Sequence, residues 1–191
     1  MAQTGLTYAR DPHDLERYRE ITEIALQIFA AGSASELGSV RALFAHERGH
    51  ATPKVDVRVA VFRNDTVLMV RERQDGLWTL PGGWSDVGET AAESAVREVR
   101  EESGYDVSVT RLLALYDKRM HPHPPQAFYV FKLIFEATIV GGEAQCSDET
   151  DGVAFFTADA LPPLSLDRIL PAQIARAFAL HADPAAAADF D

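Results

Sequence analysis

The sequence has 191 residues, 47% of them hydrophobic and 25% charged, which is typical of one soluble globular domain with room for a small extension. Its formal net charge of −11 argues against a nucleic-acid partner, and no apolar run reaches the roughly 20 residues of a membrane span. The polar N-terminus lacks a secretory pattern and Cys146 is the single cysteine, so we expect a cytoplasmic protein without disulfides or membrane partners.

The N-terminal region, residues 1–52, is predicted to form a helical domain. Asp11 is an N-cap residue and Pro12 suits the first helical turn. Apolar residues then recur at spacings of three and four up to Gly32, which predicts an amphipathic helix. A second helix is predicted from about residue 35 to 48. The long helix has more apolar surface than two isolated helices bury, which favours packing on the rest of the chain or across a homodimer.

From residue 53 the apolar period changes from helical to alternating. The alternating valines from residue 55 to 61 predict a strand with one apolar face. The predicted strands lie near residues 55–61, 66–70, 77–80, 107–116, 128–139 and 153–157, and the predicted helices at 90–103 and 170–181. The pattern indicates an α+β domain over residues 53–184, followed by a loose tail over residues 185–191.

A glycine-rich loop from residue 81 to 88 leads into an acidic helix. At about 100° per residue, Glu98, Glu101 and Glu102 share roughly 100° of its circumference. Like charges at these spacings repel each other, whereas a hard divalent cation such as Mg²⁺ or Mn²⁺ binds such oxygen ligands. For the glutamates alone, the alternative is a solvated acidic face paired with the neighbouring arginines.

The loop and the helix together resemble the signature of the Nudix hydrolases. The matching charged and glycine positions are Gly83, Glu89, Arg97, Glu98, Glu101, Glu102 and Gly104. The resemblance implies an α/β/α sandwich of Nudix type with a mixed sheet. It also implies an enzyme that uses magnesium or manganese to hydrolyse a nucleoside diphosphate linked to another moiety.

The same resemblance implies roles for individual residues. The residues implied to bind the metal ion are Glu98, Glu101, Glu102 and, through its carbonyl, Gly82. The residues implied to hold the loop in place are Gly83, Glu89, Gly104 and the ion-pair partner of Glu89, Arg97. The expected catalytic set is Glu98, Glu101, Glu102, Glu149 and Arg97, with one carboxylate as general base. For Glu149 the alternative is an acidic residue of a surface loop, and Asp151 is a second candidate for its role.

A cationic loop follows the strand near residues 107–116. Lys118 and Arg119 are predicted to contact substrate, because both residue types match phosphate oxygens. The alternative is a proline-stiffened hairpin loop whose charges keep it soluble. His121 and His123 lack further zinc ligands nearby. Trp84 is predicted to stack on a base, and a core or interface position is its alternative.

A second resemblance covers residues 3 to about 170. Its features are the segments 3–8, 11–18, 80–84, 117–118, 121–125 and 161–165. They are similar to a Nudix subfamily that carries a helical N-terminal domain and includes CDP-choline and ADP-ribose pyrophosphatases. This likeness favours cleavage of such a substrate to a nucleoside monophosphate and a phosphorylated product.

Two other functions remain open on the sequence alone. One is hydrolysis of a nucleoside triphosphate in cleansing of the nucleotide pool. The other is a non-catalytic sensor of a nucleotide sugar, although all signature glutamates are present. Hydrolysis of a messenger-RNA cap fits poorly with the net charge of −11.

Overall fold

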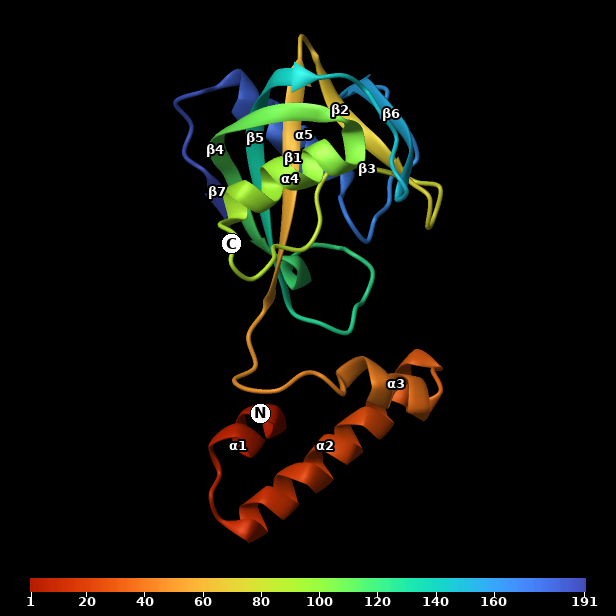
Figure 1. The fold of residues 1–191 in the computed structure, drawn as a ribbon, viewed down its shortest axis with the longest axis vertical. Coiled ribbons are helices and arrows are strands. Elements are labelled where there is room, and N and C mark those ends of the chain that lie inside the picture. The colour runs from red at the N-terminus through yellow and green to blue at the C-terminus, as the bar shows by residue number, and fades with distance from the viewer. The chain divides into compact units, whose positions relative to one another are not determined.

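The computed structural model describes residues 1–191 and divides into two compact units, Met1–Thr52 and Pro53–Asp191 (Figure 1). The helices are α1 (Ala2–Tyr8), α2 (Pro12–Ser33), α3 (Leu37–Phe44), α4 (Ala91–Ser103) and α5 (Pro171–Ala182), with a 3-10 turn η1 (Lys118–Met120). The strands are β1 (Lys54–Arg63), β2 (Thr66–Glu72), β3 (Trp78–Thr79), β4 (Tyr105–Asp117), β5 (Val130–Gly142), β6 (Thr150–Thr157) and β7 (Asp189–Phe190). None of the helices has both the length and the apolar character of a membrane span.

Helix α2 begins at Pro12 after the N-cap residue Asp11, as the sequence predicts. The side chain of Asp11 accepts hydrogen bonds from the backbone N–H groups of His13 and Asp14 at 2.9 and 3.1 Å. Pro12 occupies the first turn. N–H groups there have no partner within the helix, so the N–H that proline lacks costs no hydrogen bond. The cap and the proline therefore fix this end of the helix locally.

The short helix α1 was not predicted. Gly5 lies in its middle, and glycine disfavours helix in isolation. Here the glycine has a packing reason, since a Cβ at this position would lie 2.5 Å from the ring of Tyr18 in α2. Close packing against α2 thus overrides the local preference.

An apolar stripe of α2 stays exposed within the N-terminal unit. Ile21, Ile24 and Ile28 are 49%, 54% and 68% exposed and follow one another at helical spacing on one face. Phe29, in contrast, packs edge-to-face on Phe44 of α3, with ring centroids 5.7 Å apart. The helical unit therefore buries only part of its amphipathic surface.

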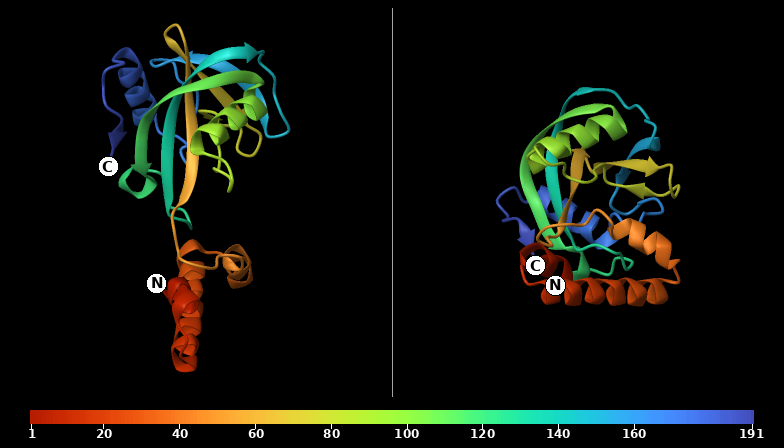
Figure 2. Two further views of the ribbon diagram at one scale, coloured as in Figure 1. Left: turned by 60° about the vertical axis from the view of Figure 1, so that its left-hand side comes forward. Right: turned by 60° about the horizontal axis from the view of Figure 1, so that its bottom comes forward.

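The second unit is built on a mixed, seven-stranded sheet. Its strand order is β3-β2-β1-β5-β4-β7, and β6 pairs with β2. β1 runs parallel to β5, and β7 runs parallel to β4, while the other pairings are antiparallel. Helices α4 and α5 cover opposite faces of the sheet (Figures 1 and 2). This is the α/β/α sandwich with a mixed sheet that was predicted.

Strand β1 has the predicted apolar face, and its other face is buried as well. The odd face packs its valines against Ala95 and Val99 of α4. The even face carries the polar residues of the alternation, and Asp56 and Arg58 are each only 5% exposed. Alternation of apolar and polar residues cannot by itself distinguish a solvent-exposed polar face from a buried, ion-paired one.

The predicted loose tail is wrong for the last residues. Asp189 pairs with Ala114 in the β4–β7 ladder and accepts a hydrogen bond from the hydroxyl of Tyr116 at 2.9 Å. The side chain of Asp191 accepts a hydrogen bond from the backbone N–H of Asp117 at 2.7 Å. These carboxylates find donors on the edge of β4, which an alanine-rich composition does not reveal.

Candidate active site

The loop before α4 is held along β1 by backbone hydrogen bonds. The N–H of Val59 donates to the carbonyl of Pro81 at 2.9 Å, and the N–H of Val57 donates to the carbonyl of Gly83 at 2.8 Å. The loop therefore continues the sheet locally, and its position is set by β1.

Two consecutive glycines allow this loop to approach both its strand and its helix. A Cβ at Gly82 would lie 2.0 Å from the carbonyl oxygen of Val57, and its φ of +141° is a conformation that suits glycine. A Cβ at Gly83 would lie 2.9 Å from Oε1 of Glu98. The backbone N–H of Gly82 donates to Oε2 of Glu102 at 2.8 Å. The glycines thus bring the loop backbone onto two of the predicted metal ligands.

Helix α4 has well-defined ends. Its N-terminus is a capping box in which Thr90 and Glu93 each bond the other's backbone N–H, at 3.2 and 2.8 Å. Its C-cap, Gly104, has φ of +77°. The helix predicted at residues 90–103 is confirmed, and its caps fix where it begins and ends.

One guanidinium is shared by four carboxylates beside the loop. Arg97 lies 3.1 Å from Glu89, 3.0 Å from Glu98 and 3.1 Å from Glu101. Asp86 lies 3.5 Å away, within ion-pair distance. A single positive charge does not balance four carboxylates, so negative charge remains uncompensated here.

Glu102 is the most deeply buried of the signature glutamates, at 4% exposed, and it forms no ion pair. Burial, together with the charges of Glu72 and Glu98, raises the pKa of its carboxyl to about 8. Arg58 and the N–H of Gly82 act in the opposite direction. Burial also raises the pKa of Glu98. A cation beside these carboxyls would restore their charged forms.

The donor chemistry of the cluster fits a hard divalent cation, because the side-chain ligands on offer are carboxylate oxygens with negative charge in excess. The side chains do not form a complete ligand set as they stand. No three His, Cys, Asp or Glu side chains converge in a geometry that holds a metal ion, and both Glu98 and Glu101 are bonded to Arg97.

The loop that contains Glu149 contacts the C-terminal end of α4. The hydroxyl of Thr150 donates to the carbonyl of Glu102 at 2.7 Å, which places exposed Glu149 one residue from that contact. The charge of Glu149 contributes to the raised pKa of Glu72. Asp151 is instead paired with Arg71 at 2.6 Å, so Glu149 is the freer of the two candidates.

A cavity of about 470 Å³ opens beside the loop, and we call it the charged cavity. Gly83 and Trp84 form part of its wall. Trp84 is 49% exposed, which leaves its ring open to a ligand. The charged residues that line the cavity are Asp56, Arg58, Asp75, Lys118, Lys132, Asp167 and Arg168. Four cations and three carboxylates line the cavity, so positive charge is in excess there in a protein of net charge −11, which suits an anionic ligand.

The wall of the charged cavity contains a buried ion-paired cluster that sequence reasoning missed. Asp56 accepts a hydrogen bond from Nη2 of Arg58 at 2.8 Å and another from Nζ of Lys132, which is 1% exposed. Burial alone would raise the pKa of Asp56, but the two cations outweigh it and hold this pKa low. The feature of the sequence that could have indicated this cluster is Lys132, a single lysine among the apolar residues of β5.

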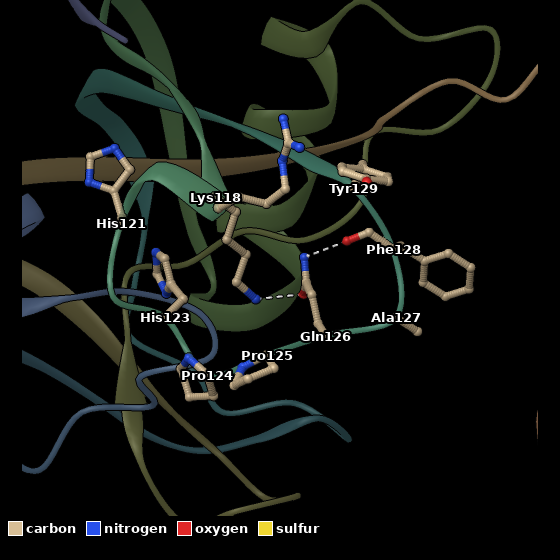
Figure 3. A pocket seen from close by; sticks show the side chains of 10 residues that line it. Lys118, His121, His123, Pro124, Pro125, Gln126, Ala127, Phe128 and Tyr129 are labelled. Atoms are coloured by element: carbon tan, nitrogen blue, oxygen red, sulfur yellow. Dashed lines mark hydrogen bonds between the residues drawn. The ribbon is translucent and has the colours of Figure 1, made fainter. Parts of the chain in front are cut away.

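The loop from η1 to β5 encloses a second cavity of about 400 Å³, which we call the loop cavity (Figure 3). Arg119 lines only this cavity. Its guanidinium pairs with Asp117 and lies 4.4 Å from the ring centroid of Tyr129. Lys118 lines both cavities. Of the two predicted substrate contacts, the structure therefore places only Lys118 at the charged cavity.

The two histidines of this loop have structural partners. Nδ1 of His123 lies 2.6 Å from the carbonyl of Leu166, and its Nε2 lies 3.2 Å from the amide nitrogen of Gln173. Burial lowers the pKa of His123 to about 4, so the ring is neutral near pH 7. His121 lies 3.1 Å from Asp191. Both rings anchor the loop to other parts of the unit.

Comparison with known proteins identifies the family. A model described as NUDIX domain matches residues 52–178, and one described as UDP-X-like, N-terminal oligomerisation domain matches residues 1–44. "Putative ADP-ribose pyrophosphatase YjhB" of Bacillus subtilis is 42% identical over 93% of this chain and 86% of its own length.

Two solved structures support the same assignment. The crystal structure of a UDP-X diphosphatase has a TM-score of 0.69 at 31% identity and covers 100% of this chain and 92% of its own. An ADP-ribose pyrophosphatase from Streptococcus suis has a TM-score of 0.68 at 39% identity, over 73% of this chain and 100% of its own. The chain belongs to the Nudix hydrolases and carries the N-terminal domain of the UDP-X-like type.

Proposed function

We propose that this Nudix hydrolase is a metal-dependent pyrophosphohydrolase. It cleaves a nucleoside diphosphate linked to another moiety, X, into a nucleoside monophosphate and phosphorylated X. The observation that carries the proposal is the buried carboxyl of Glu102, bonded to the N–H of Gly82 beside a cavity lined by four cations. An uncompensated acidic cluster next to a cavity whose four cations outnumber its three carboxylates suits a metal-bound diphosphate.

Glu98, Glu101 and Glu102 would hold the cation, together with the carbonyl of Gly82. When bound, Mg²⁺ or Mn²⁺ neutralises charge on phosphoryl oxygens and lowers the pKa of water. Arg97 keeps the carboxylates in place through Glu89, at 3.1 Å. The general base is a carboxylate that takes a proton from the attacking water.

Glu149 is our candidate for the general base. It is exposed in the structure and forms no ion pair, so its carboxylate is available to accept a proton. Its neighbour Thr150 is bonded to the backbone of Glu102 at 2.7 Å, which fixes the loop beside the metal-binding end of α4.

The diphosphate would lie against the cations of the charged cavity, among them Lys118 and Arg168. The half-exposed ring of Trp84 is available to stack on a base. Two adjoining cavities favour a substrate with a group on each side of its diphosphate over a nucleoside triphosphate. The names of the relatives point to ADP-ribose or a UDP-linked compound, and CDP-choline is a further candidate.

The function is tested by a panel of ADP-ribose, UDP-glucose, CDP-choline and 8-oxo-dGTP with Mg²⁺ or Mn²⁺, with products identified by ³¹P NMR. We expect kcat/KM of about 10⁴ M⁻¹s⁻¹ or more for at least one diphosphate compound, at least about tenfold above 8-oxo-dGTP. Excess EDTA should abolish turnover, and added Mg²⁺ should restore it.

Two results of that panel would refute the proposal. Turnover of the triphosphate alone would assign the site to nucleotide-pool cleansing. Binding of a nucleotide sugar without any hydrolysis would support a sensor.

We also propose that the N-terminal unit forms a homodimer. The exposed stripe of Ile21, Ile24 and Ile28 supports this, as does the description of the matching domain. Sedimentation equilibrium should give twice the chain mass of 21.0 kDa, and Ile24→Asp should shift the protein towards monomer. A monomeric wild-type protein at micromolar concentration would contradict it.

A further inference from the structure

The charged cavity and the loop cavity share a wall that consists of Lys118 and Gln126, which line both. Figure 3 shows the side chain of Lys118 reaching across to Gln126. The ammonium nitrogen donates to Oε1 of Gln126 at 2.6 Å. This hydrogen bond therefore lies between the cationic compartment and the compartment built by the loop.

The buried ammonium of Lys118 is bonded to a neutral amide and not to a carboxylate. Its residue is 6% exposed, and it forms no ion pair within 4 Å. An ammonium has three N–H donors, and one is used on a neutral amide. Hydrogen bonds from a cation to a phosphate or carboxylate oxygen are roughly twice as strong as neutral ones. An anion that enters the charged cavity can thus displace Gln126 from Lys118.

Gln126, in contrast, is fixed in position by its own loop. Its amide nitrogen donates to the carbonyl of Phe128 at 3.1 Å. Pro124 and Pro125 precede it and restrict the backbone. The loop is anchored further by His123, which lies 2.6 Å from the carbonyl of Leu166. Gln126 is exposed and Lys118 is buried, but Gln126 belongs to an anchored, proline-stiffened loop. The ammonium of Lys118 ends a long side chain and is bonded to a neutral amide, so it is the group that an entering anion displaces.

We propose that Gln126 is a positioning residue for specificity, which keeps Lys118 in the wall until an anionic diphosphate draws the ammonium into the charged cavity. The wall then opens, and the loop cavity receives the X group. A nucleotide without X gains nothing from the second compartment. The inference rests on the proposed function, because it assigns the diphosphate to one cavity and X to the other.

The test compares Gln126→Ala and Gln126→Glu with the wild-type protein. Calorimetry in EDTA measures Kd for ADP and ADP-ribose, and for UDP and UDP-glucose. The alanine variant frees Lys118 for the diphosphate that both nucleotides carry, so we expect about fivefold tighter binding of the parent nucleotide and a larger gain for the X-bearing one, which also enters the opened second cavity. The glutamate variant pairs with Lys118 and locks the wall, so both nucleotides should bind about tenfold more weakly.

Steady-state kinetics adds a second readout. In both variants KM should change in the direction of Kd, while kcat stays within about twofold, because neither change touches the reacting atoms. Gln145→Glu is the matched control, since it adds the same charge at an exposed position. It should leave Kd and KM at wild-type values, and circular dichroism melting checks that each variant is folded.

The outcomes separate this inference from the proposed function. Turnover by the wild-type protein, with Gln126 variants that match it in Kd and KM, overturns the inference alone. The expected Kd changes without any hydrolysis would support the shared wall and refute the enzyme activity. Absence of binding by all four nucleotides overturns the inference, and absence of turnover across the whole panel in addition overturns both.

Discussion

Replacement of Glu102 by glutamine should lower kcat about a thousandfold and leave the fold intact. A metal ion at phosphoryl oxygens is worth several kcal/mol of transition-state stabilisation, and each ~1.4 kcal/mol is a factor of ten in rate. Glutamine keeps a side-chain oxygen that can accept the hydrogen bond from the N–H of Gly82. In the wild-type protein this N–H lies 2.8 Å from Oε2 of Glu102. Because the pKa of this buried carboxyl is about 8, glutamine replaces a group that is largely neutral near pH 7, so the melting temperature should not fall.

Glu143→Gln is the control for this change, because Glu143 is an exposed acid outside the cluster. Steady-state rates on the best substrate of the panel should lie within about twofold of wild type. If Glu102→Gln kept more than a tenth of wild-type kcat, Glu102 would not be part of the reacting centre.

The second large effect is expected at Gly82. Alanine there would put a Cβ 2.0 Å from the carbonyl oxygen of Val57 and 2.9 Å from Cα of Arg58. Both are backbone atoms that cannot rotate away, and φ of +141° adds strain. We expect the free energy of unfolding to fall by about 3 kcal/mol or more, measured by urea denaturation, together with loss of the bond to Glu102.

Gly88 provides a matched control in the same loop. Its φ is +100°, but a Cβ there would meet nothing within 4 Å. Gly88→Ala therefore measures backbone strain without the clash, and about 1–2 kcal/mol is expected. Equal losses for the two variants would mean that contact with β1 does not determine the position of the loop.

The elements that sequence predicted well have local causes. Helix α4 begins at a capping box and ends at Gly104 in the left-handed conformation, and α2 begins at the Asp11 cap. Such signals lie within a few residues of the chain. The spacing of Glu98, Glu101 and Glu102 likewise follows from the helical period, so their common arc was predictable.

The parts that sequence did not reveal depend on contacts between distant residues. Asp56, Arg58 and Lys132 form one buried cluster only because β1 pairs in parallel with β5. Gln126 meets Lys118 through the shape of a loop. The pairing of Arg97 with Glu101 follows the i,i+4 spacing of a helix, and its pairing with Glu89 was implied by the resemblance. Its approach to Asp86, in contrast, depends on how the loop packs.

The central claim is that the acidic cluster of α4 binds the catalytic cation, and direct titration with Mn²⁺ tests it most closely. Electron paramagnetic resonance of free Mn²⁺ gives the Kd for the wild-type protein and for Glu102→Gln, without any substrate. We expect saturable binding by the wild-type protein and at least about tenfold weaker binding by the variant. Equal affinity and stoichiometry in the two proteins would contradict the claim.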